Sequence, residues 1–406
     1  KNTTQDAMLI TKFCHKTLSK SLKNFNQARV KSLFDCSNAL IRGNELSLTT
    51  IGRNLEGRSN VKHKIKRADR FLSNTKLHNE LTELYGAISS HFLKELPFYI
   101  IGVDWSGCCN RDFWLLRASL LVDGRAIPIF NTVVAEEDQE KEHIHNQFLD
   151  SLTTIIPKDK PVYIVTDGGF KTPWFHKVAS LGWFFLGRVR GNIHGQLEED
   201  SWKSISELTI SATDKPKTLG KGRLGKTSKT QVQGFFHLFK GKKKNRHNKK
   251  RRKSQIYPDA EKTYKAIANE PWLLITNDSY LSAKTAVIYY SKRMQIEQNF
   301  RDDKSQRYGF SWQNSKSIGT KRISVLSLIA CVATVVLWIV GFEAERQNQH
   351  YRYQANSLKT KRVLSFLSLA KNILKDTPLR RVLQWFRNGV AALSIGYPSI
   401  ISRPLQ

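Results

Sequence analysis

Segments with the patterns of strands and helices follow one another between Phe98 and Val189 in an order that few folds can accommodate. Three strands come first, the second and third joined by a turn, and two more strands follow, each after a helix. The first and fourth strands are continuous apolar runs, as strands at the centre of a sheet should be. The predicted strands are Phe98–Val103, Phe113–Val122, Ala126–Val134, Val162–Val165 and Trp183–Val189, and the predicted helices are Lys141–Thr154 and Pro173–Leu181. The order predicts an α/β fold with a mixed five-stranded sheet.

A hairpin-connected meander followed by α/β crossovers is the order of the ribonuclease H fold, and composition places other regions around it. The segment between the two parts of this core is rich in Gly, Lys and Ser, and it includes the strand-like run Gln231–Phe239. The predicted regions are a helical, basic N-terminal domain at 1–95, a ribonuclease H-like catalytic core at 96–188 and 272–320, a β-rich insertion with a basic loop at 189–271, and a helical C-terminal region at 321–406.

Basic residues exceed acidic ones by 66 to 34, which gives the chain a formal charge of +32. This surplus predicts a polyanionic partner, because contacts with phosphates release counterions. DNA or RNA is favoured over the alternatives, a ribosome-associated protein or a protein of the membrane surface. Ten of the fourteen residues from Lys240 to Lys253 are Lys or Arg, which is too dense a charge for a packed core. That loop would follow DNA, or it would be a localisation signal or a solvated loop.

A helix-turn-helix is predicted within the N-terminal domain. Ser47–Leu55 predicts a short helix, and Gly57 predicts a turn after it. Asn60, or Ser59, can cap a second helix that ends near Leu72. The cations on this second helix suit a DNA groove, and they are Lys62, Lys64, Lys66, Arg67 and Arg70. The alternative interpretation is a solvated basic helix in an ordinary bundle.

Five cysteines have neither disulfide nor zinc spacing, which predicts free thiols in a reducing compartment. No signal peptide is predicted, and we expect a cytoplasmic protein. The uncharged run Ile323–Phe342 is long enough to span a bilayer. It contains hydroxyl residues and belongs to a highly basic chain, so a buried core helix is preferred to a membrane span.

Two carboxylates, Asp104 and Asp167, follow the apolar strands that are predicted to be central. Strand ends are where sites form in open α/β sheets. A carboxylate that ends a strand is usually a cap, and Asp167-Gly168-Gly169 is also a plain turn sequence. Two such positions on central strands of a basic protein nevertheless favour a metal site.

A helix predicted from Tyr290 to Lys304 would place four functional side chains on one face. Tyr290, Arg293, Glu297 and Lys304 are separated by three, four and seven residues. At about 100° per residue, they fall within roughly 60° of one another. A solvated charged face would explain any one of them, but a carboxylate between two cations suits a metal ligand beside a bound phosphate.

The same four residues match the signature Tyr-x2-Arg-x3-Glu-x6-Lys, and the chain thereby resembles the insertion-sequence DDE transposases of the YREK group. The run Tyr-Ser-Lys-Arg-Met-Gln-Ile-Glu is similar to the cut-and-paste transposase of the bacterial tetracycline-resistance transposon. Three shorter segments share that similarity: Val-Asp-Trp-Ser at 103–106, Pro-Trp-Phe at 173–175 and Arg-Val-Arg-Gly at 188–191. The resemblance extends over essentially the whole chain and implies a ribonuclease H-like core with a β insertion between Asp167 and Glu297.

The resemblance implies a catalytic and metal-binding set of Asp104, Asp167 and Glu297. Hard oxygen ligands suit Mg²⁺, with Mn²⁺ able to substitute. Two such ions, about 3.5–4 Å apart, would serve the attacking and the leaving oxygen of each displacement at phosphorus. The implied reaction is cleavage at the terminal inverted repeats, through a hairpin intermediate, followed by strand transfer into target DNA.

The resemblance also implies contacts with DNA. Tyr290, Arg293 and Lys304 would hold the DNA end by its phosphates. Trp272 would stack on a flipped base, which is worth about 1–3 kcal/mol, although it could equally be a core residue. Some relatives have a second tryptophan after the signature Arg, where this chain has Met294.

The implied working form is a homodimer that bridges two ends in a bacterial, nucleoid-associated setting, without a membrane partner. A structure-selective nuclease on the same core would share the three carboxylates without needing Tyr290, Arg293 and Lys304. A DNA-binding protein that descends from a transposase and has lost catalysis is the alternative from another class, and the intact carboxylates argue against it.

Overall fold

The computed structural model describes residues 21–108, 112–198, 200–228, 231–241, 269–355, 357–358 and 362–403. The chain folds into two compact units. Unit 1 comprises Lys1–Val162 and Lys292–Gln406, and unit 2 comprises Tyr163–Ser291. Both ends of the chain therefore contribute to unit 1, and the division into four regions stays a prediction.

Unit 1 contains an antiparallel meander of β1 (Tyr99–Gly107), β2 (Phe113–Leu120) and β3 (Ile127–Ala135). The apolar run that begins β1 is fully buried, as expected for a central strand. The predicted hairpin between β2 and β3 is confirmed, and Gly124 in its turn has a φ of +67°, a conformation that favours glycine. After β3, the chain continues to α7 (Glu142–Ile155).

Helices precede this meander along the chain, namely α2 (Gln27–Gly43), α3 (Leu48–Asn54), α4 (Val61–Leu72), α5 (Thr75–Asn79) and α6 (Leu81–Leu93). The two predicted helices and the turn between them are present, with Ser47 capping α3 through the N–H of Thr50 and Gly57 at a φ of +114°. Gly52 lets α3 approach α4 closely, because an added Cβ would lie 2.6 Å from the Cα of Ile65.

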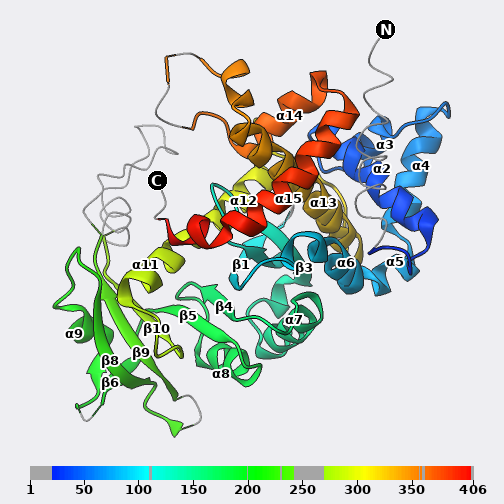
Figure 1. Ribbon diagram of the computed structural model, residues 1–406. Coiled ribbons are helices and arrows are strands. Elements are labelled where there is room, and N and C mark those ends of the chain that lie inside the picture. Colours follow the sequence, from blue (N-terminus) through cyan, green and yellow to red (C-terminus); the bar gives the residue numbers. More distant parts are fainter. Residues whose placement is uncertain are drawn as a thin grey trace, which may run out of the picture. The chain divides into compact units, whose positions relative to one another are not determined.

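A long apolar helix, α13 (Thr320–Arg346), runs through the core of unit 1 (Figure 1). It packs against β3, α2 and α6, and also against α14 (Phe366–Asp376) and α15 (Leu379–Ser402). The helix is long and apolar enough to cross a membrane, but 94% of its most apolar window is buried inside the protein. The predicted buried core helix is therefore confirmed.

Unit 2 contains a mixed sheet in the order β4-β5-β10-β9-β8-β6-β7. Strands β4 and β5 are parallel and are joined through α8, whereas the other neighbours are antiparallel. The elements are β4 (Val162–Thr166), α8 (Thr172–Ser180), β5 (Phe184–Val189), β6 (His194–Leu197), β7 (Lys203–Ser204), α9 (Ile205–Thr209), β8 (Lys217–Leu224), β9 (Val232–Phe239), β10 (Trp272–Thr276) and α11 (Ala283–Lys292).

The mixed α/β class predicted from the sequence is confirmed, and the predicted strands are present with ends displaced by a few residues. The predicted sheet of five strands is wrong, because in unit 2 the sheet continues from β5 through β10, β9, β8, β6 and β7. Strands β6, β8 and β9 fall within the segment predicted as a β-rich insertion. The predicted basic loop lies, from residue 242 onward, outside the described residues. Cys36, Cys108 and Cys331 are free thiols, as expected, and Cys14 and Cys109 also lie outside that part of the chain.

Candidate active site

Asp104 lies inside β1, whereas the sequence predicted that it would directly follow the strand. The strand continues to Gly107 because Ser106 and Gly107 still pair with β2. Oδ1 of Asp104 accepts a hydrogen bond from the backbone N–H of Trp105 at 2.9 Å, and the side chain is 15% exposed. A largely buried carboxylate is therefore held by its own strand.

The helix predicted from Tyr290 to Lys304 is interrupted at Arg293, which corrects the prediction of one continuous helix. Helix α11 ends at Lys292, and α12 (Met294–Lys304) begins immediately after the break. Arg293 keeps right-handed helical angles, and α12 starts with the tighter hydrogen bond from the N–H of Ile296 to the carbonyl of Arg293. The boundary between the two units lies just before this interruption, so Tyr290 belongs to unit 2 and the other three signature residues belong to unit 1.

Arg293 brings two of the predicted catalytic carboxylates together. Its Nη1 donates to Oδ2 of Asp104 at 3.0 Å, and its Nη2 donates to Oε1 of Glu297 at 2.7 Å. The side chains of Arg293 and Asp104 are 10% and 15% exposed, so water screens their ion pair weakly, whereas Glu297 is 35% exposed and its ion pair is screened more. Two acidic side chains that are distant in sequence therefore share one positive charge.

The opposite face of α12 is fixed to the segment that follows β2. Gln295, which is 1% exposed, accepts a hydrogen bond from the N–H of Val122 at 2.9 Å and donates one to its carbonyl at 2.7 Å. Asn299, one turn further on, donates to the carbonyl of Ala126 at 2.9 Å. Glu297 lies about 200° around the helix from Gln295. Rotation or sliding of α12 would break these bonds, so they hold Glu297 in place relative to the hairpin.

Further polar contacts surround the Asp104 strand. Nζ of Lys304 donates to Oγ of Ser106 at 2.8 Å, which places the fourth signature residue beside β1. Nε1 of Trp105 donates to Nε2 of His145 on α7 at 3.1 Å. Burial lowers the pKa of His145 to about 4, so the imidazole is neutral near pH 7 and can accept this hydrogen bond.

A buried polar network continues from α12 to the helices of unit 1. Nη1 of Arg117 on β2 lies 2.8 Å from Oδ2 of Asp303, and its Nε donates to Oδ1 of Asn131 at 2.9 Å. Asn131 donates in turn to the hydroxyl of Tyr85, which is 3.1 Å from the hydroxyl of Ser327. Burial raises the pKa of Asp303. The ion pair with Arg117 opposes this shift, because a neighbouring cation favours the charged carboxylate.

Asp167 directly follows β4, as the sequence predicted. Its Oδ1 accepts a hydrogen bond from the N–H of Gly169 at 2.9 Å, which is the turn geometry expected of Asp-Gly-Gly. Asp167 belongs to unit 2, whereas Asp104 and Glu297 belong to unit 1. Within the described ranges, no group of three or more His, Cys, Asp or Glu side chains is arranged to hold a metal ion.

Trp272 and Tyr290 lie together in unit 2, with ring centroids 4.8 Å apart in an edge-to-face arrangement. Tyr290 is only 4% exposed, whereas Trp272 is half-buried. The side chain of Tyr290 is hydrogen-bonded to Arg188 on β5, which also forms an ion pair with Glu270 at 3.0 Å. The tyrosine of the signature thus packs against Trp272 and Arg188.

The predicted DNA-binding residues of α4 differ in exposure. Lys62 and Arg70 are exposed, and Lys64 is half-buried. Arg67 is also half-buried, and its Nη2 lies 3.8 Å from Oδ2 of Asp35 on α2. Lys66, the fifth cation predicted on this helix, is exposed as well, so Lys62, Lys66 and Arg70 have the most accessible charge.

Comparison with known protein families decides the identity of the chain. A family model described as "Transposase DDE domain" matches residues 102–334, which is more than half of the 406 residues. The chain belongs to the DDE transposase family. No curated protein matches it.

The matched region of this DDE transposase begins two residues before Asp104 and ends within α13. It therefore includes every predicted catalytic residue and the four signature residues, but not α4. Transposases act on DNA, which agrees with the formal charge of +32. DDE transposases generally use divalent metal ions.

Sequence reasoning missed the residues that position the site of this transposase. Gln295 and Asn299 are spaced by four residues on the face of α12 opposite Glu297, and this spacing is the one signal that could have identified them. His145 and Arg117 carried no comparable signal, because their partners come from other elements of the fold.

Proposed function

We propose that this transposase belongs to the YREK group and performs cut-and-paste transposition. It would cleave DNA at the terminal inverted repeats, close and reopen a hairpin at each element end, and transfer the 3′ ends into target DNA. The observation that carries the proposal is the pairing of Asp104 and Glu297 through Arg293 inside the matched region. These residues have the types and the order of the family signature.

Asp104, Asp167 and Glu297 are proposed as the metal ligands of this site. Carboxylate oxygens suit Mg²⁺ or Mn²⁺. The guanidinium of Arg293 already lies between Asp104 and Glu297, which supports the proposal that the two carboxylates can bind a cation there. The bound ions supply Lewis-acid activation of the attacking and leaving oxygens. The chain itself contributes by holding Glu297 on α12 through Gln295 and by excluding water around the Asp104 carboxylate.

The DNA contacts follow from the same proposal. Tyr290, Arg293 and Lys304 would hold phosphates of the element end, and Trp272 would stack on a flipped base. The half-buried ring of Trp272 supports this, since a stacking ring must keep an accessible face. Binding of terminal repeats by the N-terminal helices would use cations of α4, namely Lys62, Lys64, Arg67 and Arg70. A homodimer would bridge two ends in the cytoplasm, at the nucleoid.

The test is cleavage of a supercoiled plasmid that carries the native flanking ends, in Mg²⁺. The wild-type protein should release a linear fragment with hairpin ends, and Glu297→Gln should bind the ends without cutting. Glu137→Gln, which removes an exposed charge outside the site, is the matched control and should cut normally. Equal nicking by wild type and Glu297→Gln would remove Glu297 from the site. End binding without cutting by the wild type would favour a catalytically silent DNA-binding protein.

A further inference from the structure

Arg293 binds the same two carboxylates, those of Asp104 and Glu297, that the proposed metal ion would need. We propose that Arg293 is an internal counter-cation, which holds the two carboxylates before metal is bound and has to release them when metal is loaded. This inference rests on the proposed function, because it takes the two carboxylates to be metal ligands. It adds a competition between an arginine of the chain and the ion.

The hydrogen bonds of Asp104 support this competition. Its Oδ1 accepts from the N–H of Trp105, and its Oδ2 accepts from Nη1 of Arg293, so both oxygens are already engaged. Glu297 is held in the same way through Oε1. A divalent ion held by these oxygens would have to compete with a guanidinium that already lies within hydrogen-bonding distance of the same atoms. Two cations in that space repel each other, and low exposure strengthens the repulsion.

The released guanidinium has a second anion to bind. A guanidinium pairs with a phosphate through two parallel hydrogen bonds, as it does with a carboxylate. A phosphate of the DNA end that attracts Arg293 therefore frees Asp104 and Glu297 for metal. Since linkage between two ligands is reciprocal, bound DNA should tighten metal binding, and bound metal should tighten the hold on the DNA end.

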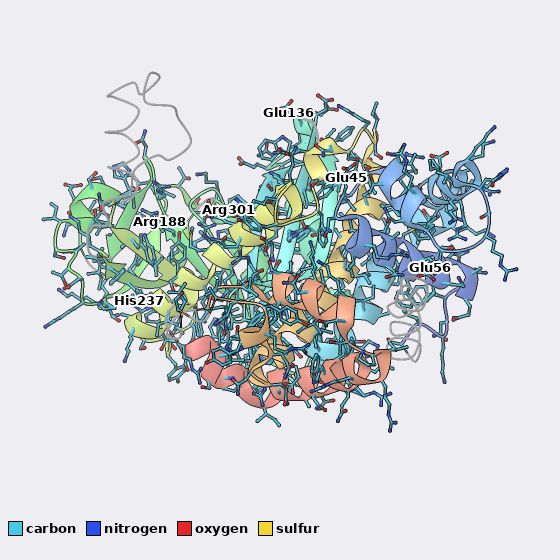
Figure 2. The ribbon with its side chains drawn as sticks, turned by 90° about the horizontal axis from the view of Figure 1, so that it is seen from above. Glu45, Glu56, Glu136, Arg188, His237 and Arg301 are labelled. Carbon is cyan, nitrogen blue, oxygen red and sulfur yellow. The ribbon has the colours of Figure 1, made fainter. Side chains whose placement is uncertain are left out.

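The experiment is a titration of the full-length protein with Mn²⁺, in which electron paramagnetic resonance reports the free ion. Arg293→Met should bind Mn²⁺ about tenfold or more tightly than the wild type, because it removes a neighbouring unit charge. Arg293→Lys, which keeps the charge, should stay nearer the wild type. Arg301→Met is the matched control: it removes an exposed charge from the same helix (Figure 2) and should leave the affinity near that of the wild type. The variants Asp104→Asn and Glu297→Gln test separately whether these two carboxylates bind Mn²⁺.

The outcomes distinguish two claims: that Asp104 and Glu297 bind the metal, and that Arg293 competes with the metal for them. If the carboxylate variants lose Mn²⁺ while Arg293→Met binds it no more tightly than the wild type, the counter-cation is disproved and the proposed ligands stand. If the carboxylate variants bind Mn²⁺ like the wild type, the proposed ligands fail and the inference fails with them. Absence of Mn²⁺ binding by Arg293→Met also overturns the inference, since removal of the competitor should expose the site.

A second Mn²⁺ titration, with DNA present, tests the coupling between metal and DNA binding. A duplex with the native flanking end should tighten Mn²⁺ binding by the wild type, after subtraction of the ions bound by the duplex alone. The same duplex should have little effect on Arg293→Met, in which no guanidinium remains to be moved. Equal tightening in both proteins would show that Arg293 does not link the two ligands.

Discussion

His145 accepts a hydrogen bond from the indole of Trp105, the neighbour of Asp104, and it must be neutral to do so. Burial holds the pKa of His145 at about 4 in the folded protein, whereas the unfolded chain has the ordinary value of 6.5. Between these two pH values the unfolded state takes up a proton that the folded state does not. The contribution of the neutral imidazole is therefore fully present above pH 6.5 and is lost as pH falls towards 4.

We expect the replacement His145→Gln to remove this pH dependence while keeping an acceptor for Trp105. On lowering the pH from 7 to 4.5, the wild type should lose up to about 3 kcal/mol more free energy of unfolding than the variant. Urea unfolding of both proteins at the two pH values measures the difference. Equal losses in the two proteins would show that His145 does not titrate between these states.

At the scale of elements, α12 has two polar faces. One face is hydrogen-bonded to the hairpin, and the other carries Glu297. Replacing Gln295 with Leu leaves the N–H of Val122 without its side-chain partner, and the carbonyl of Val122 keeps only the 3.3 Å hydrogen bond from Nζ of Lys292. The loss of both bonds to Gln295 frees α12 to shift. We expect plasmid cleavage to slow by about 100-fold, because a misplacement of 1 Å costs roughly that factor. Binding of the ends, measured by gel shift, should be unchanged.

Gln298→Leu is the matched control for that prediction, since Gln298 lies on the same helix and is only half-buried. It should cleave at the wild-type rate. A Gln295→Leu protein that remains folded and cuts normally would show that the two hydrogen bonds to Val122 do not set the position of Glu297.

Two helical glycines of unit 1 should respond to alanine with opposite sign. An added Cβ at Gly341 would overlap the carbonyl oxygen of Phe366, so Gly341→Ala has to push α14 away from α13. We expect a loss of about 1–3 kcal/mol in the free energy of unfolding. At Gly396 on α15 the nearest atom would be 3.6 Å away, an ordinary contact, so Gly396→Ala should gain up to about 1 kcal/mol. Thermal unfolding of both variants tests this, and a shared sign would contradict it.

At the scale of the molecule, α13 gives the N-terminal helices and the β meander a common core. Replacing the fully buried Leu328 with Ala should cost about 2–5 kcal/mol of unfolding free energy. Hydrogen exchange should then show loss of protection in α2 and in β3 together, because both pack on the same helix. The control Ile395→Ala, at a position that is 85% exposed, should change nothing measurable. Loss of protection in only one of the two elements would indicate separate cores.

Much of the fold could be predicted from the sequence because its signals are local. Apolar runs identified the strands, Gly124 and Gly57 identified turns, and the uncharged run identified α13. The proximity of Arg293 and Glu297 could also be predicted, because they are four residues apart and Arg293 keeps helical backbone angles. The continuation of β1 past Asp104 and the break at Arg293 could not be predicted, since neither has a distinctive residue pattern.

Apart from the four-residue spacing of Gln295 and Asn299, the sequence carried no signal of the positioning residues, for a physical reason. A glutamine such as Gln295 looks like a solvated residue until the backbone of Val122 is placed beside it. The charge of Arg117 likewise looks like a surface charge until Asp303 is seen to be buried next to it. Partners of this kind are separated by more than a hundred residues, and no local periodicity connects them.

Because unit 1 is assembled from both ends of the chain, its core cannot close on the ribosome until α13 has been made. The apolar faces of α2 and β3 that will pack on α13 stay open during most of translation. A gene copy that is cut short before Thr320 by a stop codon or a frameshift therefore encodes a chain without its central helix. Such a chain lacks the helix on which both α2 and β3 pack, so the apolar faces of these two elements stay uncovered.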